Sequence, residues 1–187
     1  SIGDGPTKIS ELPVMAAPIQ VALYPALGRP ITAEDESLRP SAEIMEASGA
    51  EEPEPIVMEA DQVRKVDTGA GVDVGIMPSE KGMCVVVSVA PDEVTGSCIP
   101  EASIESAGLN VGFERADRYF AVGVLPSSWS KQVMVVGSDG QREEVLANGD
   151  GAYIVAAGQA PREIIVTDGL GVRHPVLGGE PAASGTP

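Results

Sequence analysis

Residues 81–100 read KGMCVVVSVAPDEVTGSCIP and contain Cys84 and Cys98, the only two cysteines of the 187-residue chain. Apolar runs flank a turn region of Pro-Asp-Glu and Thr-Gly-Ser, which predicts two antiparallel strands closed by a disulfide. A redox switch or a metal clip is the alternative, but metal sites need closely spaced ligands with further His or Cys. A structural disulfide is therefore favoured, and it indicates an oxidising compartment outside the cytosol.

The chain from residue 62 onward has the period and composition of β-strands. Only 3% of residues are aromatic, so a core must use Val, Ile, Leu, Ala and Met, which favours strands. Asp139-Gly140 and the Asn-Gly-Asp-Gly run at 148–151 suit tight hairpins, which predicts an antiparallel meander in the last third. One helix is expected at 99–107, ending at Gly108. Strands are predicted at 62–66, 72–77, 83–89, 109–113, 119–125, 132–137, 143–147, 152–157, 162–167 and 171–176.

Residues 31–61 have a different, acidic composition. Ten carboxylates face one basic residue, Arg39, which gives this stretch a charge of −9 out of −16 for the chain. Thr32 followed by Asp35 resembles a capping box, and Ser41 with Gly49 marks a second start and stop. The sequence therefore predicts two short helices broken at Pro40, followed by a stiff connection through EEPEP at 51–55. A solvated surface is the ordinary interpretation of such a charge run, and binding of a basic partner or cations is the alternative.

These patterns divide the chain into four parts. Residues 1–30, rich in Pro, Ala and Gly, are expected to form an extended arm that docks on the domain. Residues 31–61 form the acidic helical segment, 62–177 the β domain with its disulfide, and 178–187 a disordered tail. The chain begins Ser-Ile-Gly without Met, so a signal peptide or membrane anchor before residue 1 is compatible with the sequence.

The net charge of −16 limits the partners. It repels nucleic acid and anionic lipid, so neither is an expected partner, although simple solubility also explains the charge. We expect a protein or a component of the cell envelope as the partner, and no cofactor. The β region at 62–177 lacks clustered ionisable residues in its sequence, and a catalytic site needs at least two within mutual reach. The sequence therefore predicts a protein without catalytic activity.

One short motif points the other way. Asp67-Thr-Gly-Ala70 resembles the signature of retroviral-type aspartic proteases, in which two such carboxylates, one from each subunit, share a proton and activate water. Those proteases have an apolar strand leading into the Asp, whereas Arg64-Lys65-Val66 leads in here, and the chain has no second copy of the motif. A turn between two strands explains the residues without any special function and is the favoured interpretation. A homodimeric protease using Asp67 remains the alternative function.

Other candidate site residues have simpler structural interpretations. Asn148, Asp150 and Asp139 carry oxygen ligands suited to calcium, but their spacing matches hairpin turns better, and no metal site is predicted. His174, the only histidine, would have to serve any Ser-His or Cys-His system, but a bystander role is favoured. Trp129, the only tryptophan, is the candidate binding residue if it is exposed. Packing against the sheet edge is the favoured interpretation of Trp129.

Several ordered phrases resemble a group of uncharacterised extracytoplasmic domains of soil actinobacteria. The likeness covers YPALGRPIT at 24–32, GMCVVV at 82–87 with GSC at 96–98, and the long block VGVLPSSWSKQVMVVGSDGQREEVLANGDGAYIV at 122–155. Where the group has Pro-Asp-Gly, this chain has Pro126-Ser127-Ser128. The resemblance implies a secreted or membrane-anchored domain and a disulfide, and it assigns no activity. The expected fold is a mainly β, antiparallel two-sheet sandwich with an N-terminal arm and one to three short helices.

Overall fold

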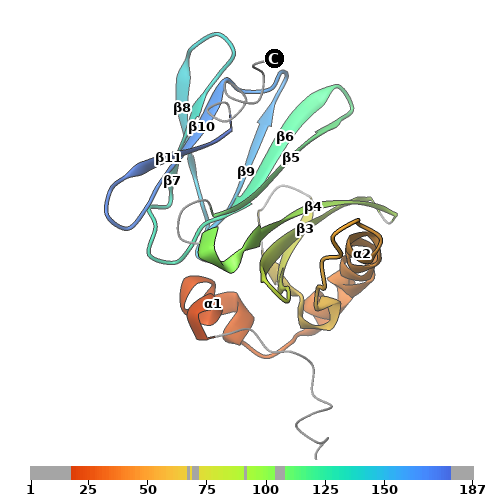
Figure 1. Cartoon of the computed structure of the whole chain (residues 1–187). Helices are drawn as coiled ribbons and strands as arrows, with labels where there is room; N and C mark the ends of the chain where they lie inside the picture. Colours follow the sequence, from red (N-terminus) through yellow and green to blue (C-terminus); the bar gives the residue numbers. More distant parts are fainter. Residues whose placement is uncertain (1–17, 67, 69–71, 91, 104–107, 178–187) are drawn as a thin grey trace, which may run out of the picture.

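The computed structural model describes residues 18–66, 68, 72–90, 92–103 and 108–177. Within these residues the strands form three antiparallel sheets (Figure 1). The first sheet has the order β1-β2-β3-β4, the middle sheet β5-β6-β9, and the outer sheet β11-β10-β7-β8. The predicted class, a mainly β antiparallel sandwich with a few short helices, is confirmed, with three sheets among the described residues in place of the expected two. The strands are β1 Arg64–Val66, β2 Asp73–Pro78, β3 Gly82–Ala90, β4 Glu93–Pro100, β5 Leu109–Arg115, β6 Arg118–Val124, β7 Gln132–Val136, β8 Arg142–Leu146, β9 Ala152–Ala157, β10 Glu163–Thr167 and β11 Arg173–Leu177.

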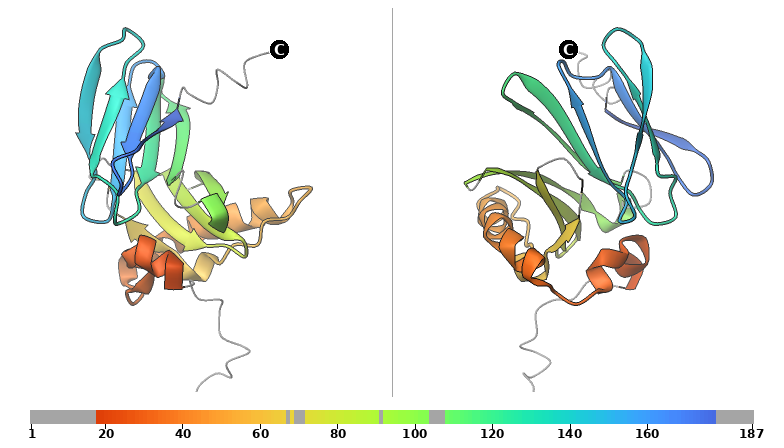
Figure 2. Two further views of the ribbon diagram at one scale, coloured as in Figure 1. Left: turned by 60° about the vertical axis from the view of Figure 1, so that its left-hand side comes forward. Right: turned by 180° about the vertical axis from the view of Figure 1, so that it is seen from behind.

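The sheets and the longest helix stack in layers, because successive strand residues face opposite sides. In β3, Met83, Val85 and Val87 pack in a core with the middle sheet, while Cys84 and Val86 face helix α2, Ala33–Ala50. The middle sheet has two apolar faces as well, one toward the first sheet and one toward the outer sheet. The order is therefore α2, first sheet, middle sheet and outer sheet (Figure 2).

Helix α2 runs without interruption across the position where a break is expected. Thr32 and Asp35 form the predicted capping box, but the predicted break at Pro40 is wrong. Leu38 and Ala42, four residues apart on either side of Pro40, are both buried against the first sheet. This packing outweighs the backbone hydrogen bond that the proline removes.

The remaining helical pieces are short. They are α1 Pro18–Leu23 and the 3-10 turns η3 Pro25–Gly28, η4 Ala60–Gln62 and η5 Glu101–Ser103. The helix expected at 99–107 is wrong at its start, because residues 99 and 100 belong to β4 and only residues 101–103 turn. Residues 104–107 lie outside the described part, as do the tail 178–187 and residues 1–17 of the expected arm.

The predicted meander is correct for the β7–β8 and β10–β11 hairpins and wrong for the strand between them, β9. Strand β9 leaves the outer sheet to pair with β6, and β10 returns to pair with β7. The reason is the sequence of the two strands. β8 reads REEVL and is largely exposed, so it suits an edge, whereas β9 reads AYIVAA and is apolar on both faces. A strand of the second kind is most stable between two cores.

We expect that Gly123→Ala lowers the free energy of unfolding by about 1–3 kcal/mol, because the core must expand. Gly123 lies opposite Tyr153, and an added Cβ would overlap the buried Tyr153 ring. Gly158→Ala is the matched control, since Gly158 follows β9 and has open space around it. Urea unfolding of both variants checks this, and equal midpoints would show that the ring moves aside without cost.

Candidate functional site

The disulfide confirms the pairing that the sequence predicts. Cys84 and Cys98 are direct partners across β3 and β4, with a Cα–Cα distance of 4.0 Å. Cys84 is buried in the core beneath α2, while Cys98 is half-buried and reaches the surface. The bridge thus links the interior of the first sheet to its β4 edge.

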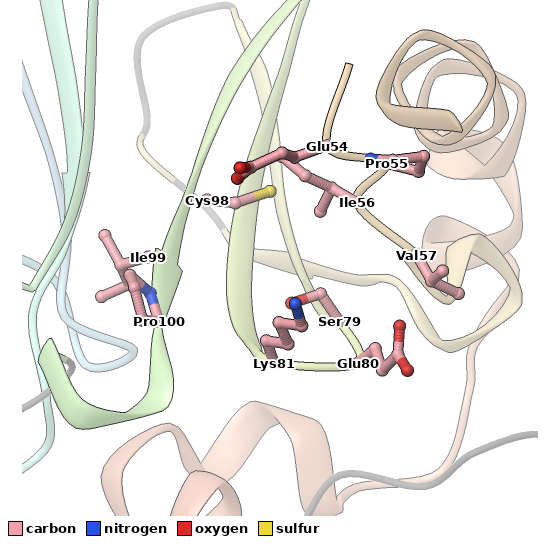
Figure 3. Close-up of a pocket in the computed structure, with 10 residues that line it drawn as sticks. All are labelled: Glu54, Pro55, Ile56, Val57, Ser79, Glu80, Lys81, Cys98, Ile99 and Pro100. Atoms are coloured by element: carbon pink, nitrogen blue, oxygen red, sulfur yellow. The ribbon is translucent and has the colours of Figure 1, made fainter. Parts of the chain in front are cut away.

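A hollow of about 210 Å³ lies where β4 ends (Figure 3). Three segments form its walls: the Pro-rich stretch at 54–57, the turn at 79–81 and the last residues of β4. Its lining is Glu54, Pro55, Ile56, Val57, Ser79, Glu80, Lys81, Cys98, Ile99 and Pro100.

A second hollow, of about 320 Å³, adjoins the first and shares Ile56 and Cys98 with it. One wall is the C-terminal half of α2, through Ile44, Met45 and Ser48, and the other is residues 94–98 of β4. We call the two hollows together the β4 groove. It follows β4 over most of its length.

Apolar side chains are exposed in the β4 groove. Among the described residues, eight large apolar side chains are exposed, and three of them line the groove: Ile44, Ile56 and Val57. Val57 is 49% exposed and Ile44 41%. Exposed apolar residues are ordinary when scattered, but a cluster in a concave surface is typical of a binding site.

Backbone contacts hold the Pro-rich wall of the groove in place. The N–H of Ile56 donates to the carbonyl of Gly49 at 3.0 Å, and the N–H of Glu80 donates to the carbonyl of Val57 at 2.8 Å. Met58 and Ser79 form an isolated β-bridge just beyond. The exposed apolar side chains are therefore presented on a fixed backbone, which lowers the entropy cost of binding a partner.

A buried ion pair fixes the other end of α2. Asp35 is fully buried and accepts two hydrogen bonds from Arg29, at 2.6 and 2.9 Å, and one each from the N–H groups of Thr32 and Lys65. Burial alone would raise the pKa of Asp35, but these hydrogen bonds outweigh it and hold the pKa well below its usual range. The cluster joins the segment before α2 to strand β1.

No protein-family model, no curated protein and no solved structure matches this chain.

Trp129 lies in a core instead of on the surface. Its side chain is 6% exposed, packs between the middle and outer sheets, and stacks on His174 with ring centroids 5.3 Å apart. His174 Nε2 lies 2.8 Å from Asp168 Oδ2. Asp168 also accepts the N–H groups of Leu170 and Val172. Its pKa is lowered by the hydrogen bond to His174 first and by the Val172 amide next. This cluster organises the turn before β11.

Two of the three turn residues that could have bound calcium, Asn148 and Asp139, use a side-chain oxygen within the protein. Asn148 Oδ1 accepts the N–H groups of Asp150 and Ala152, and Asp139 Oδ1 accepts the N–H of Gln141. Gly140 and Gly151 have φ of 83° and 85°, the left-handed conformation that these turns require. In the described part of the chain, no group of three or more His, Cys, Asp or Glu is placed to hold a metal ion.

Asp67, the residue of the protease alternative, lies outside the described residues together with Gly69 and Ala70. Strands β1 and β2, which precede and follow this motif, are antiparallel neighbours. Among the described helices, none is long and apolar enough to cross a membrane.

Sequence reasoning identified the disulfide and missed the β4 groove beside it. Ile44, Ile56 and Val57 lie in the stretch at 31–61, whose charge predicts an acidic, solvated surface. The available signal was the apolar triplet Ile56-Val57-Met58 directly after the prolines. Its partner surface, β4, is almost 40 residues away and is brought near only by the fold.

Proposed function

We propose that the protein is a non-catalytic interaction module of an extracytoplasmic compartment, secreted or membrane-anchored, which binds a protein partner in the β4 groove. The exposed cluster of Ile44, Ile56 and Val57 along a concave surface carries this proposal. The groove is preformed, apolar at its centre and lined by a few charged side chains, as protein-binding surfaces commonly are.

The disulfide supports the extracytoplasmic location in this proposal. A disulfide bond is compatible with an oxidising location, since cytosolic thiols are normally kept reduced. The resemblance of residues 82–98 and 122–155 to extracytoplasmic domains agrees with this part of the proposal. Mass spectrometry of protein isolated from its own host, with free thiols blocked at lysis, should find Cys84 and Cys98 unblocked. Two blocked thiols would refute the extracytoplasmic location and leave the proposed binding surface untouched.

Selection from a displayed random-peptide library tests the binding surface. Peptides enriched on the wild-type protein should bind the Ile56→Asp variant about tenfold or more weakly. A charge at the centre of an apolar site should lower the binding free energy by at least about 1.4 kcal/mol. Leu146→Asp is the control, because Leu146 is also exposed but lies on β8 in the outer sheet. Thermal unfolding verifies that both variants are folded. Failure to enrich any peptide, or equal binding by both variants, would refute the proposed function.

A further inference from the structure

We propose that the free edge of β4 accepts an additional strand, supplied by an extended segment of a partner protein that carries basic side chains. This inference rests on the proposed function, because it specifies the partner of the same groove. It goes further by assigning the binding mode to backbone hydrogen bonds and the specificity to charge.

The register of β3 and β4 shows which backbone groups face the free edge. Opposed residues in antiparallel strands lie about 5.5 Å apart in hydrogen-bonded pairs and about 4.5 Å apart in the alternate pairs. The 4.0 Å Cα–Cα distance assigns Cys84 and Cys98 to the second kind. The N–H and C=O groups of Cys98 therefore point away from β3. By the period of two, those of Gly96 and Val94 do the same.

These outward groups have no described backbone partner. Outside the regular helix and strand ladders, none of the backbone hydrogen bonds between described residues involves residues 93–100. β4 is the last strand of its sheet. A row of unpaired donors and acceptors of this kind is a template for one more strand.

The groove lies along this edge. Neighbouring residues of a strand point to opposite faces, so a hollow over one face would be lined by alternate residues only. Five consecutive residues of β4, from Val94 to Cys98, line the larger hollow. The backbone of β4 therefore borders the hollow together with its side chains, and a strand added at the free edge would lie about 4.8 Å from β4. Ile56 and Val57 on the opposite wall are placed to contact its side chains.

β4 also lacks the features that block strand addition at two other sheet edges, β1 and β8. β1, at the opposite edge of the first sheet, carries Arg64 and Lys65, and β8 carries Arg142, Glu143 and Glu144. Charges of this kind discourage edge-to-edge pairing. Between Val94 and Ile99, β4 has neither a charged residue nor a proline.

The charges around the groove select the occupant. Glu52, Glu54 and Glu80 line the two hollows together with one basic residue, Lys81. Glu93 and Glu101 stand at the two ends of β4. A second copy of this chain, with its net charge of −16, would meet these carboxylates with the same sign. An extended segment with Lys or Arg flanking apolar residues complements the groove in charge and in shape.

Hydrogen exchange followed by NMR, with a short synthetic peptide that alternates valine and lysine, tests the binding mode. At saturating peptide, exchange of the Val94, Gly96 and Cys98 amides should slow by about tenfold or more, because they gain hydrogen bonds. The Thr95 and Ser97 amides, which face β3, should not change. A peptide with glutamate in place of lysine should bind about tenfold or more weakly. Added salt should reduce this difference in affinity between the two peptides.

Charge reversal tests the basic partner from the protein side. Glu54→Lys should weaken binding of the valine-lysine peptide, whereas Glu144→Lys on β8 should leave it unchanged. Two valine-lysine peptides can be N-methylated at alternate residues, one at the odd and one at the even positions. Their affinities for the protein should differ sharply, since only one of the two sets removes the N–H groups that pair with β4. Equal binding by these two peptides would overturn strand addition.

The remaining outcomes separate this inference from the proposed function. If the valine-lysine peptide binds but the three amides exchange as before, strand addition is wrong and the interaction module stands. If library peptides bind in an Ile56-dependent way but the valine-lysine peptide does not, the basic partner is wrong. If the three amides become protected with increasing protein concentration alone, the occupant is a second copy. If no peptide is enriched, the proposed function itself fails.

Discussion

Replacing Asp35 with alanine is expected to lower the free energy of unfolding by about 3 kcal/mol, because it leaves three partners of a buried carboxylate without an acceptor. Arg29 loses both of its hydrogen bonds to Asp35, and the N–H groups of Thr32 and Lys65 lose theirs. The capping box of α2 is lost as well, which is worth about 1 kcal/mol in itself. Urea unfolding at neutral pH measures the total.

Asp73→Ala is the matched control for this experiment. Asp73 pairs with Lys65 at 3.2 Å, but its side chain is 59% exposed, so the loss should stay below about 1 kcal/mol. Equal destabilisation by Asp35→Ala and Asp73→Ala would show that the buried carboxylate is not the anchor that its contacts indicate.

The pH dependence gives a second test of the same group. The pKa of Asp35 is lowered in the folded state from an unfolded value of 3.8, so its ionised form stabilises the fold. That stabilisation is complete above pH 3.8 and is lost as the pH falls through the folded-state pKa. Asp35→Asn cannot titrate, so its stability should decline less between neutral pH and acid than that of the wild type. Parallel declines would contradict this assignment.

Reducing the disulfide is expected to cost roughly 3 kcal/mol, since the closed loop of about 15 residues regains its freedom in the unfolded state. The double variant Cys84→Ala/Cys98→Ala should show a similar loss, and reductant should not change it further. Unfolding by urea with and without reductant provides the comparison. A loss below about 1 kcal/mol in the wild type would mean that the strand register alone holds β3 and β4 together.

The sequence predicts local structure well where a short pattern is decisive. The cysteine spacing, the Asp139-Gly140 hairpin and the capping box at Thr32 each depend on residues close together in the chain. The predicted break at Pro40 is wrong because the burial of Leu38 and Ala42, four residues apart, outweighs the local propensity of proline. Such burial depends on a sheet that is formed by residues 64–100.

The pairing of β9 with β6 and the β4 groove could not be predicted in the same way. β9 is apolar on both faces, which shows that it must be buried but not between which sheets. The groove arises from α2, the Pro-rich wall and β4, and each of these alone has an ordinary surface pattern. Trp129 shows the converse: as the only tryptophan it is the candidate binding residue, and the fold confirms the favoured interpretation, packing, by placing it in a core with His174.

The return of β9 to the middle sheet has a consequence for dividing the molecule into fragments. In chain order the outer sheet begins with β7 and β8, the middle sheet is then completed by β9, and the outer sheet finishes with β10 and β11. The two sheets are interleaved, so any single cut between residues 132 and 167 leaves one fragment with an incomplete sheet and a bare apolar face. Shortened versions made at such a boundary should aggregate, and the intact chain should lose both sheets together.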